Sequence, residues 1–433
     1  MKVLLNCVDM VNASMAGPAI RYWELAKALS KQHEVTLITP NEPNISAEGF
    51  TICPNVNDAL KKGIQKSDVV ISQKISPGMA LQAKRSRTRL ILDAYAPASL
   101  EHLELFKTLS PKRRAHHYQM INNQFLFSFK MADAVICAHE RQRDLWHGIL
   151  MSLDKLTLAK YDKDATLSNL VGIVPFGLSS TPPQADKNAL RRRYHLKDSD
   201  VLMLWGGGIW NWFDPLTLIK AVKQLDQEGY PIKLIFMGIK HPNENAPDMQ
   251  MALRAVSLAE ELGLINKSIF FNYGWTPYQE RQEFLLGADI GVSTHFAHVE
   301  THYAFRTRML DYLWAGLPII ASSGDFFADF VKQHKLGQVV PCEDVAALAQ
   351  AIKEVGSNRE LRQQIKRNMD CVRSQFHWEA VTQPLHNMIV ALANEEAPSL
   401  QFKEMMQIGY RYLTHGPRVL MRKLIPEKGA KVI

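Results

Sequence analysis

The densest group of charged side chains follows a short apolar strand expected to end at Val292. Glu300, Arg306, Arg308 and Asp311 occur there within twelve residues, where a loop runs into a predicted helix. Carboxylates accept hydrogen bonds from pairs of sugar hydroxyls, and arginines hold a diphosphate through their forked donors. A charge cluster is often only a solvated surface, but its position after a strand favours a site for a sugar and a phosphate group.

A second candidate phosphate site is the loop between Trp205 and Pro215. Gly207 and Gly208 follow a predicted strand there, and Asp214 precedes the first residue of a predicted helix. Glycines let backbone N–H groups surround an anion, and Asp-Pro is typical of a helix start. The alternative is an aromatic plug that packs between domains, because the loop also contains Trp210, Trp212 and Phe213.

A third candidate is the loop after the first strand, which leads to Gly17 and Arg21. Glycine allows a ligand to approach the backbone, and a helix N-terminus presents free N–H groups to an anion. A cation in the first turn opposes the helix dipole, which suggests that Arg21 contacts phosphate. The alternative is a plain turn with an exposed arginine. No G-x-G-x-x-G follows this strand, so a dinucleotide fingerprint is absent.

Further polar residues follow other predicted strands. Asp93, the pair Glu101-His102 and the pair His139-Glu140 are candidates for the cleft, and a histidine there could move a proton near neutral pH. We take Glu300, Asp93 and His139 as catalytic candidates, and we add Trp275 to the residues that could bind the sugar and phosphate groups. Asp93, Glu101-His102 and His139-Glu140 could equally be structural residues, and no catalytic base is singled out.

These residues require strands that end at a common edge, and the chain supplies them. Short runs rich in Val and Ile alternate with helical patterns, which is typical of parallel sheets covered by helices on both faces. We predict an α/β fold of two doubly wound, Rossmann-like domains that face a cleft, with a helical C-terminal extension. The predicted division is 1–178 for the first domain, 179–376 for the domain that carries the candidate sugar and phosphate site, and 377–433 for C-terminal helices and a basic tail that packs on the first domain or on a membrane.

In the first half, strands are predicted near residues 2–6, 35–39, 68–72, 89–93, 134–137 and 172–175. In the second half they are predicted near 201–205, 233–237, 268–272, 289–292, 318–321 and 337–340. Helices are predicted at 19–32, 215–228, 248–262, 277–286, 306–315, 345–355, 359–376 and 378–394.

Composition limits the class of protein. The five cysteines are scattered without a C-x-x-C pair, which argues against a structural zinc site and a disulfide framework and fits a reducing cytoplasm. No apolar run reaches the ~18 residues of a membrane span, and the short apolar N-terminus is predicted to be a strand, not a signal peptide.

The net charge of +8 is uneven. Residues 401–433 carry seven Lys or Arg against two Glu, and residues 107–130 carry five against none. Basic residues among apolar ones suit an anionic membrane surface, so peripheral attachment to the inner face of the membrane is one prediction. Nucleic acid is a weaker alternative and is not expected as a partner. A solvated basic face with no partner is the third.

Four segments together resemble a known family. They are Gly17–Leu29, His33–Leu37, Val174–Gly177 and, above all, Asp311–Ala321 with its D-Y-L-W-A-G-L-P sequence. They are similar to GT-B-fold glycosyltransferases of the large retaining group called family 4, and the resemblance covers nearly the whole chain.

The resemblance implies a role for several residues. An acid five positions before the glycine of the G-x-P element binds ribose hydroxyls in that family, which here is Asp311. An upstream glutamate contacts the donor sugar, which points to Glu300, although ten residues separate the two here instead of seven and Tyr303 stands at the usual place. The loop after the first strand of the second domain lacks its usual basic residues. Arg306, Arg308 and Arg21 therefore become the candidates for the diphosphate.

The resemblance also implies that no metal or other cofactor is needed, with a nucleotide-diphosphate sugar as donor substrate. The leading hypothesis is a retaining hexosyltransferase that acts on a glycan or lipid-linked acceptor in cell-surface polysaccharide synthesis. The alternatives are a GT-B sugar-nucleotide epimerase, which needs no acceptor, and a non-catalytic protein that binds sugar nucleotides in the same cleft.

Overall fold

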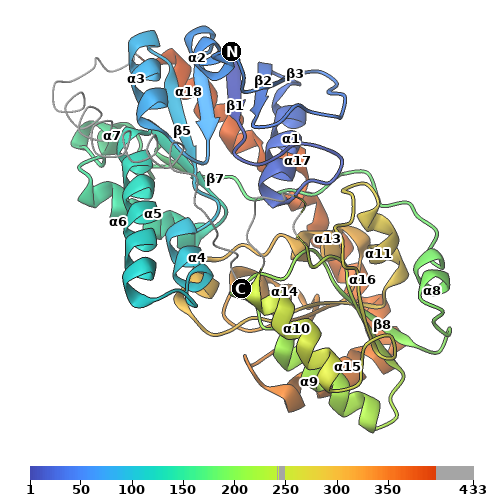
Figure 1. The fold of residues 1–433 in the computed structure, drawn as a ribbon. Helices are drawn as coiled ribbons and strands as arrows, with labels where there is room; N and C mark the ends of the chain where they lie inside the picture. The colour runs from blue at the N-terminus through green and yellow to red at the C-terminus, as the bar shows by residue number, and fades with distance from the viewer. Residues whose placement is uncertain (241, 243–248, 396–433) are drawn as a thin grey trace.

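The computed structural model describes residues 1–240, 242 and 249–395. It contains two separate parallel sheets, each with helices packed against it, and the two lie one above the other in Figure 1. The predicted α/β architecture of two Rossmann-like domains is confirmed. The predicted tail at 401–433 lies outside the described residues.

The first sheet has seven parallel strands in the order β3-β2-β1-β4-β5-β6-β7. The strand order reverses beside β1, so the loop after β1 lies at a topological switch point, where open parallel sheets bind ligands. The strands are β1 (Lys2–Asn6), β2 (Glu34–Thr39), β3 (Thr51–Pro54), β4 (Val69–Ser72), β5 (Arg89–Asp93), β6 (Ala134–Cys137) and β7 (Val171–Ile173).

Seven helices connect these strands, and α1 follows the switch-point loop. They are α1 (Gly17–Leu29), α2 (Ala59–Lys66), α3 (Pro77–Ser86), α4 (Ala98–Leu105), α5 (Pro111–Met131), α6 (Glu140–Ser152) and α7 (Leu158–Lys163).

The second sheet has six parallel strands in the order β10-β9-β8-β11-β12-β13, and its switch point lies at β8. The loop after β8 is the glycine-rich segment, so the second candidate site also stands where the strand order reverses. The strands are β8 (Val201–Trp205), β9 (Ile232–Phe236), β10 (Ile269–Phe271), β11 (Ile290–Ser293), β12 (Ile319–Ser322) and β13 (Gly337–Val340).

The helices of this half begin at polar caps in several places, as the sequence predicts. Asp214 accepts the backbone N–H of Thr217 at 3.0 Å, and Pro215 is the first residue of α9. The helices are α8 (Ala189–Arg193), α9 (Pro215–Gln227), α10 (Gln250–Glu261), α11 (Arg281–Gly287), α12 (Val299–Tyr303), α13 (Arg308–Ala315), α14 (Phe326–His334), α15 (Val345–Ser357) and α16 (Arg359–Val372).

The chain then crosses back to the first domain. After the 3₁₀ turn η1 (Arg373–Phe376), helices α17 (Trp378–Val381) and α18 (Gln383–Asn394) lie against the first sheet and α1 (Figure 1). At the crossing, the backbone N–H of Leu178 donates to the carbonyl of Phe376 at 2.8 Å, and that of Trp378 donates to Leu178 at 3.1 Å. The two chain segments that join the domains therefore run side by side.

The structure adds elements that the sequence patterns did not predict. They include the edge strand β3 and the helices α4 and α5. These two helices lie along one side of the space between the domains. The long helix predicted at 359–376 instead ends at Val372 and continues as η1. All five cysteines are free. No helix among the described residues is long and apolar enough to cross a membrane.

Candidate active site

A cavity of about 690 Å³ lies between the two domains. The first domain contributes the loop after β1, the loop after β5 and parts of α4 and α5. The second contributes the glycine-rich loop after β8, the loops after β9 and β10 and the segment from Ala304 to Asp311. The carboxyl edges of both sheets therefore face one space.

The glycine-rich loop is fastened to α13 by one hydroxyl. Tyr312 accepts the N–H of Gly206 at 2.8 Å, and its oxygen lies 2.9 Å from the carbonyl of Leu204. Gly207 has a φ of +74°, which a side chain would strain. A Cβ at Gly208 would come within 3.1 Å of the Trp275 ring, so the loop is held close to the cavity wall.

Arg308 is the arginine best placed beside this loop. Its Nη2 donates to the carbonyl of Gly208 at 2.8 Å, and its guanidinium lies 4.1 Å from the ring centre of Phe213 and 4.4 Å from that of Trp205. Burial lowers the pKa of Arg308 to about 10, which leaves it a cation at neutral pH. Its Nη1 has no hydrogen-bond partner among the described residues, so a donor remains for an anionic ligand.

Asp311 lies at the cavity wall with its side chain 32% exposed. One carboxylate oxygen accepts Nε of Arg281 at 3.0 Å. The Arg281 guanidinium is itself held between aromatic rings, 3.7 Å from the centre of Tyr278 and 4.6 Å from that of Trp314. Arg281 was not selected from the sequence. The sequence signal that could have identified Arg281 is its position at the start of a helix that follows a strand, because the other candidate residues also follow strands.

Arg306 and Glu300 form a buried pair, with both carboxylate oxygens accepting guanidinium nitrogens at 2.8 and 2.7 Å. The pair lies six residues apart, across the end of α12. The Arg306 charge is thus matched by a carboxylate of its own chain, which disfavours its predicted contact with a diphosphate. Glu300 is 1% exposed and does not line the cavity, although Arg306 does.

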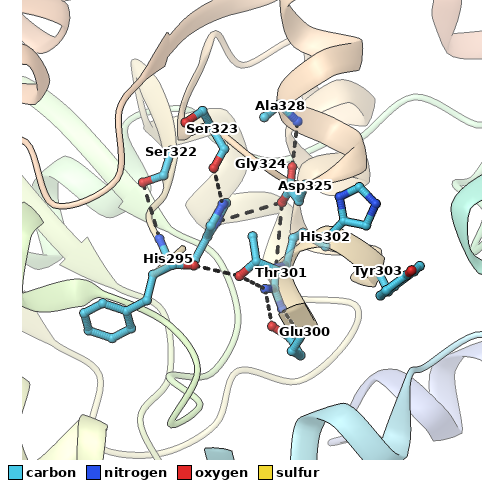
Figure 2. Close-up of polar contacts among 12 residues, drawn as sticks. His295, Glu300, Thr301, His302, Tyr303, Ser322, Ser323, Gly324, Asp325 and Ala328 are labelled. Atoms are coloured by element: carbon cyan, nitrogen blue, oxygen red, sulfur yellow. Dashed lines mark hydrogen bonds and ion pairs between the residues drawn. The ribbon is translucent and has the colours of Figure 1, made fainter. Parts of the chain in front are cut away.

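Two further buried side chains, Asp325 and His295, lie next to this pair. Figure 2 shows them near Glu300 and Thr301. Asp325 accepts the N–H of Ala328 at 2.6 Å and lies 3.7 Å from Nε of Arg306. His295 lies 3.9 Å from Asp325, and its other ring nitrogen is 3.2 Å from the carbonyl of Ser323. Burial lowers the pKa of His295 to about 3 and raises that of Asp325 to about 6.

Arg21 and Asp93 form an ion pair with each other, whereas the sequence analysis predicts a phosphate contact for Arg21 and a catalytic role for Asp93. The Arg21 guanidinium donates to both oxygens of Asp93 at 2.8 and 2.9 Å and to the carbonyls of Val174 and Pro175. Arg21 is 0% exposed. This arrangement ties α1 to β5 and β7, and it disfavours a phosphate contact for Arg21 and a free catalytic carboxylate for Asp93.

His139 is placed away from the cavity lining. Its ring stacks on Phe326 at 5.0 Å between centres, and Nε2 lies 3.2 Å from the carbonyl of Tyr303. Burial lowers its pKa to about 4. This histidine therefore joins α6 of the first domain to α12 of the second, and the geometry disfavours it as a proton carrier.

Gly17 and Trp275 line the cavity from opposite domains. The Trp275 indole donates to the carbonyl of Met15, two residues before Gly17, at 3.1 Å, so this hydrogen bond joins the two domains across the cleft. No group of three or more His, Cys, Asp or Glu that could hold a metal ion occurs in the part of the chain that the structure describes.

The second domain matches a known protein family. Residues 186–370, nearly all of the second domain, match the family model of glycosyl transferases group 1. Among curated proteins, no sequence matches the chain significantly.

Several solved structures share the fold over both domains. Sucrose-phosphate synthase from Thermosynechococcus elongatus is 17% identical, with a TM-score of 0.63 over 90% of this chain and 98% of the other. Anabaena HepE in complex with UDP-glucose is 13% identical, with a TM-score of 0.61 over 90% and 100%. WaaG, a glycosyltransferase involved in lipopolysaccharide biosynthesis, is 13% identical, with a TM-score of 0.61 over 90% of this chain and 99% of the other.

Proposed function

We propose that this chain, whose residues 186–370 match the group 1 glycosyltransferase family model and whose two domains have the GT-B fold, transfers a hexose from a nucleotide-diphosphate sugar to a hydroxyl of a glycan or lipid-linked acceptor. The observation that carries the proposal is the cavity itself. It brings the switch-point loop of each sheet to one space, with Arg308 and Asp311 on the second-domain side.

The donor is assigned to the second domain. We assign the diphosphate to the N–H groups of Gly207 and Gly208 and to Arg308, whose Nη1 has no hydrogen-bond partner among the described residues, and the ribose hydroxyls to Asp311. As the bond between C1 of the sugar and the diphosphate breaks, negative charge grows on the leaving oxygen. A buried arginine and fixed amides stabilise that charge without a metal ion.

The acceptor is assigned to the first-domain side, between the loop after β5 and helices α4 and α5. The resemblance to family 4 supports retention of configuration at C1. UDP-glucose is the first donor to try, since HepE was solved with it.

A thermal-shift assay with UDP-, GDP- and ADP-sugars tests the donor assignment. We expect stabilisation by one nucleotide series and loss of that stabilisation in Arg308→Ala. No shift with any donor would overturn the proposal. Incubation with donor alone separates the rivals, because an epimerase converts the donor without acceptor and a binding protein leaves it unchanged.

We further propose that a lipid-linked acceptor is met at an anionic membrane surface on the cytoplasmic side, in keeping with cell-surface polysaccharide synthesis. The exposed basic residues Lys112 and Arg113 support this, because they lie in the first turn of α5, a helix whose later residues Ile121 and Gln124 line the cavity. Each basic residue near anionic lipid contributes about 1 kcal/mol. Co-sedimentation with phosphatidylglycerol vesicles should fall in the Lys112→Glu, Arg113→Glu variant, and unchanged binding would refute the idea.

A further inference from the structure

Four acidic residues line the cavity, and three of them already have a partner. Asp93 pairs with Arg21, Asp311 pairs with Arg281, and the Asp9 carboxylate accepts the N–H of Met10 at 2.8 Å. The fourth is Glu101, whose side-chain carboxylate forms no hydrogen bond or ion pair with any residue that the structure describes. An acid in a cleft without a partner is available to a ligand.

The position of Glu101 is set by the chain around it. It lies in the first turn of α4, which begins directly after the loop Tyr95–Pro97 that follows β5. His102 and Leu105 of the same helix line the cavity with it. Helix α4 also packs against α12 of the second domain, so Glu101 stands where the acceptor side meets the donor side.

The surroundings of Glu101 also suit proton transfer. Burial and then the nearby negative charge of Glu300 raise its pKa to about 8, while Arg306 acts in the opposite direction. An acid–base group works best when its pKa lies near the working pH, because both forms are then populated. The cavity-lining Asp93 and Asp311 instead already accept hydrogen bonds from the guanidinium groups of Arg21 and Arg281.

We propose that Glu101 binds the acceptor hydroxyl that becomes glycosylated and takes its proton. This rests on the proposed transfer reaction. The acceptor O–H bond breaks and its proton passes to the Glu101 carboxylate. The acceptor oxygen forms a bond to C1 of the donor sugar, and the bond from C1 to the diphosphate oxygen breaks with its electron pair on the departing nucleoside diphosphate. Glu101 then releases the proton to solvent.

The test compares Glu101→Gln with Glu104→Gln in the full-length protein. Glu104 lies one turn further along the same helix, pairs with Lys107 at 2.9 Å and does not line the cavity, so it controls for the loss of a charge on α4. Positioned acid–base groups contribute about 10²–10⁴-fold to rate. We therefore expect kcat to fall about 100-fold or more in Glu101→Gln and to stay within about two-fold in Glu104→Gln.

Two readouts separate a proton carrier from a structural residue. The wild-type rate should rise with pH through about 8, because only the deprotonated carboxylate accepts a proton, and this rise should be absent in Glu101→Gln and retained in a slower Glu101→Asp. Stabilisation by the donor should persist in Glu101→Gln. A glutamine variant with the wild-type rate and pH profile would overturn the inference, as would loss of donor stabilisation in that variant. If no donor stabilises the wild type, the proposed function fails instead.

Discussion

The hydroxyl of Tyr312 lies 2.8 Å from the backbone nitrogen of Gly206, so one side chain of α13 fixes the start of the glycine-rich loop. Because α13 also carries Asp311 and begins at Arg308, the same helix positions the loop and the two charged donor-side residues.

Tyr312→Phe removes the acceptor of the Gly206 N–H and leaves a buried donor unsatisfied, which costs about 1–3 kcal/mol. We expect a lower urea midpoint and weaker stabilisation by donor. Tyr230→Phe is the control, since its hydroxyl contacts Ser357 at an exposed position. Equal midpoints for the two variants would contradict the role of Tyr312.

Gly291→Ala should be destabilising by about 1–3 kcal/mol, because an added Cβ would lie 2.5 Å from the Tyr312 ring. Gly148→Ala is the matched control. No atom lies within 4 Å of a Cβ there, and the residue is inside α6, where alanine is favoured over glycine by roughly 0.5–1 kcal/mol. Chemical denaturation should therefore shift the two variants in opposite directions.

Arg308→Ala should weaken binding of the nucleoside diphosphate about 10–100-fold, because a hydrogen bond to a charged group contributes about 1.5–3 kcal/mol. Binding of the uncharged nucleoside should change little. Calorimetric titration of both ligands checks this, with the exposed Arg254→Ala as control. Equal losses for nucleoside and diphosphate would place Arg308 away from the phosphates.

The Arg21–Asp93 pair should be strongly coupled. Removal of either partner leaves a buried charge unpaired and costs about 3–5 kcal/mol. The double variant Arg21→Ala, Asp93→Ala should then lose much less than the sum of the two single variants. Additive losses in a denaturation cycle would mean that the two side chains act independently.

Acid should weaken the folded state through His139. Its pKa is lowered to about 4 by burial, while an unfolded histidine titrates near 6.5, so the unfolded chain binds more protons between these values. Stability from this group is complete above about pH 6.5 and falls by roughly 1.4 kcal/mol per unit below it. His139→Gln should therefore lose less stability than wild type between pH 7.5 and 5.5. The exposed His116→Gln should behave as wild type.

The sheets could be predicted from the sequence because buried parallel strands are continuous apolar runs, such as Val201–Trp205 and Ala134–Cys137. The same logic missed β3. Its four residues are partly or fully exposed, and the strand ends in a proline at the sheet edge, so no apolar run marks it.

The side-chain contacts of the candidate site are harder to predict from the sequence, because its ion pairs form between segments that no local sequence pattern connects. The position of Asp311 followed from a motif, but its partner Arg281 comes from another helix. The sequence favours Arg306 as a cation for the diphosphate. In the structure α12 ends before Ala304, and the turn of the chain there lets the Arg306 guanidinium donate to the Glu300 carboxylate. Sequence spacing identifies which charges are near a site, while the backbone path decides which remain unpaired.

The side-by-side crossing at Leu178 and Trp378 also determines how the two halves can move. Because two adjacent chain segments joined by backbone hydrogen bonds resist sliding, we expect the domains to rotate about a single axis at this crossing. Contacts across the cleft, such as the hydrogen bond from Trp275 to Met15, would break in that rotation. We therefore expect the cavity to open for a substrate without loss of the hydrogen bonds at the crossing.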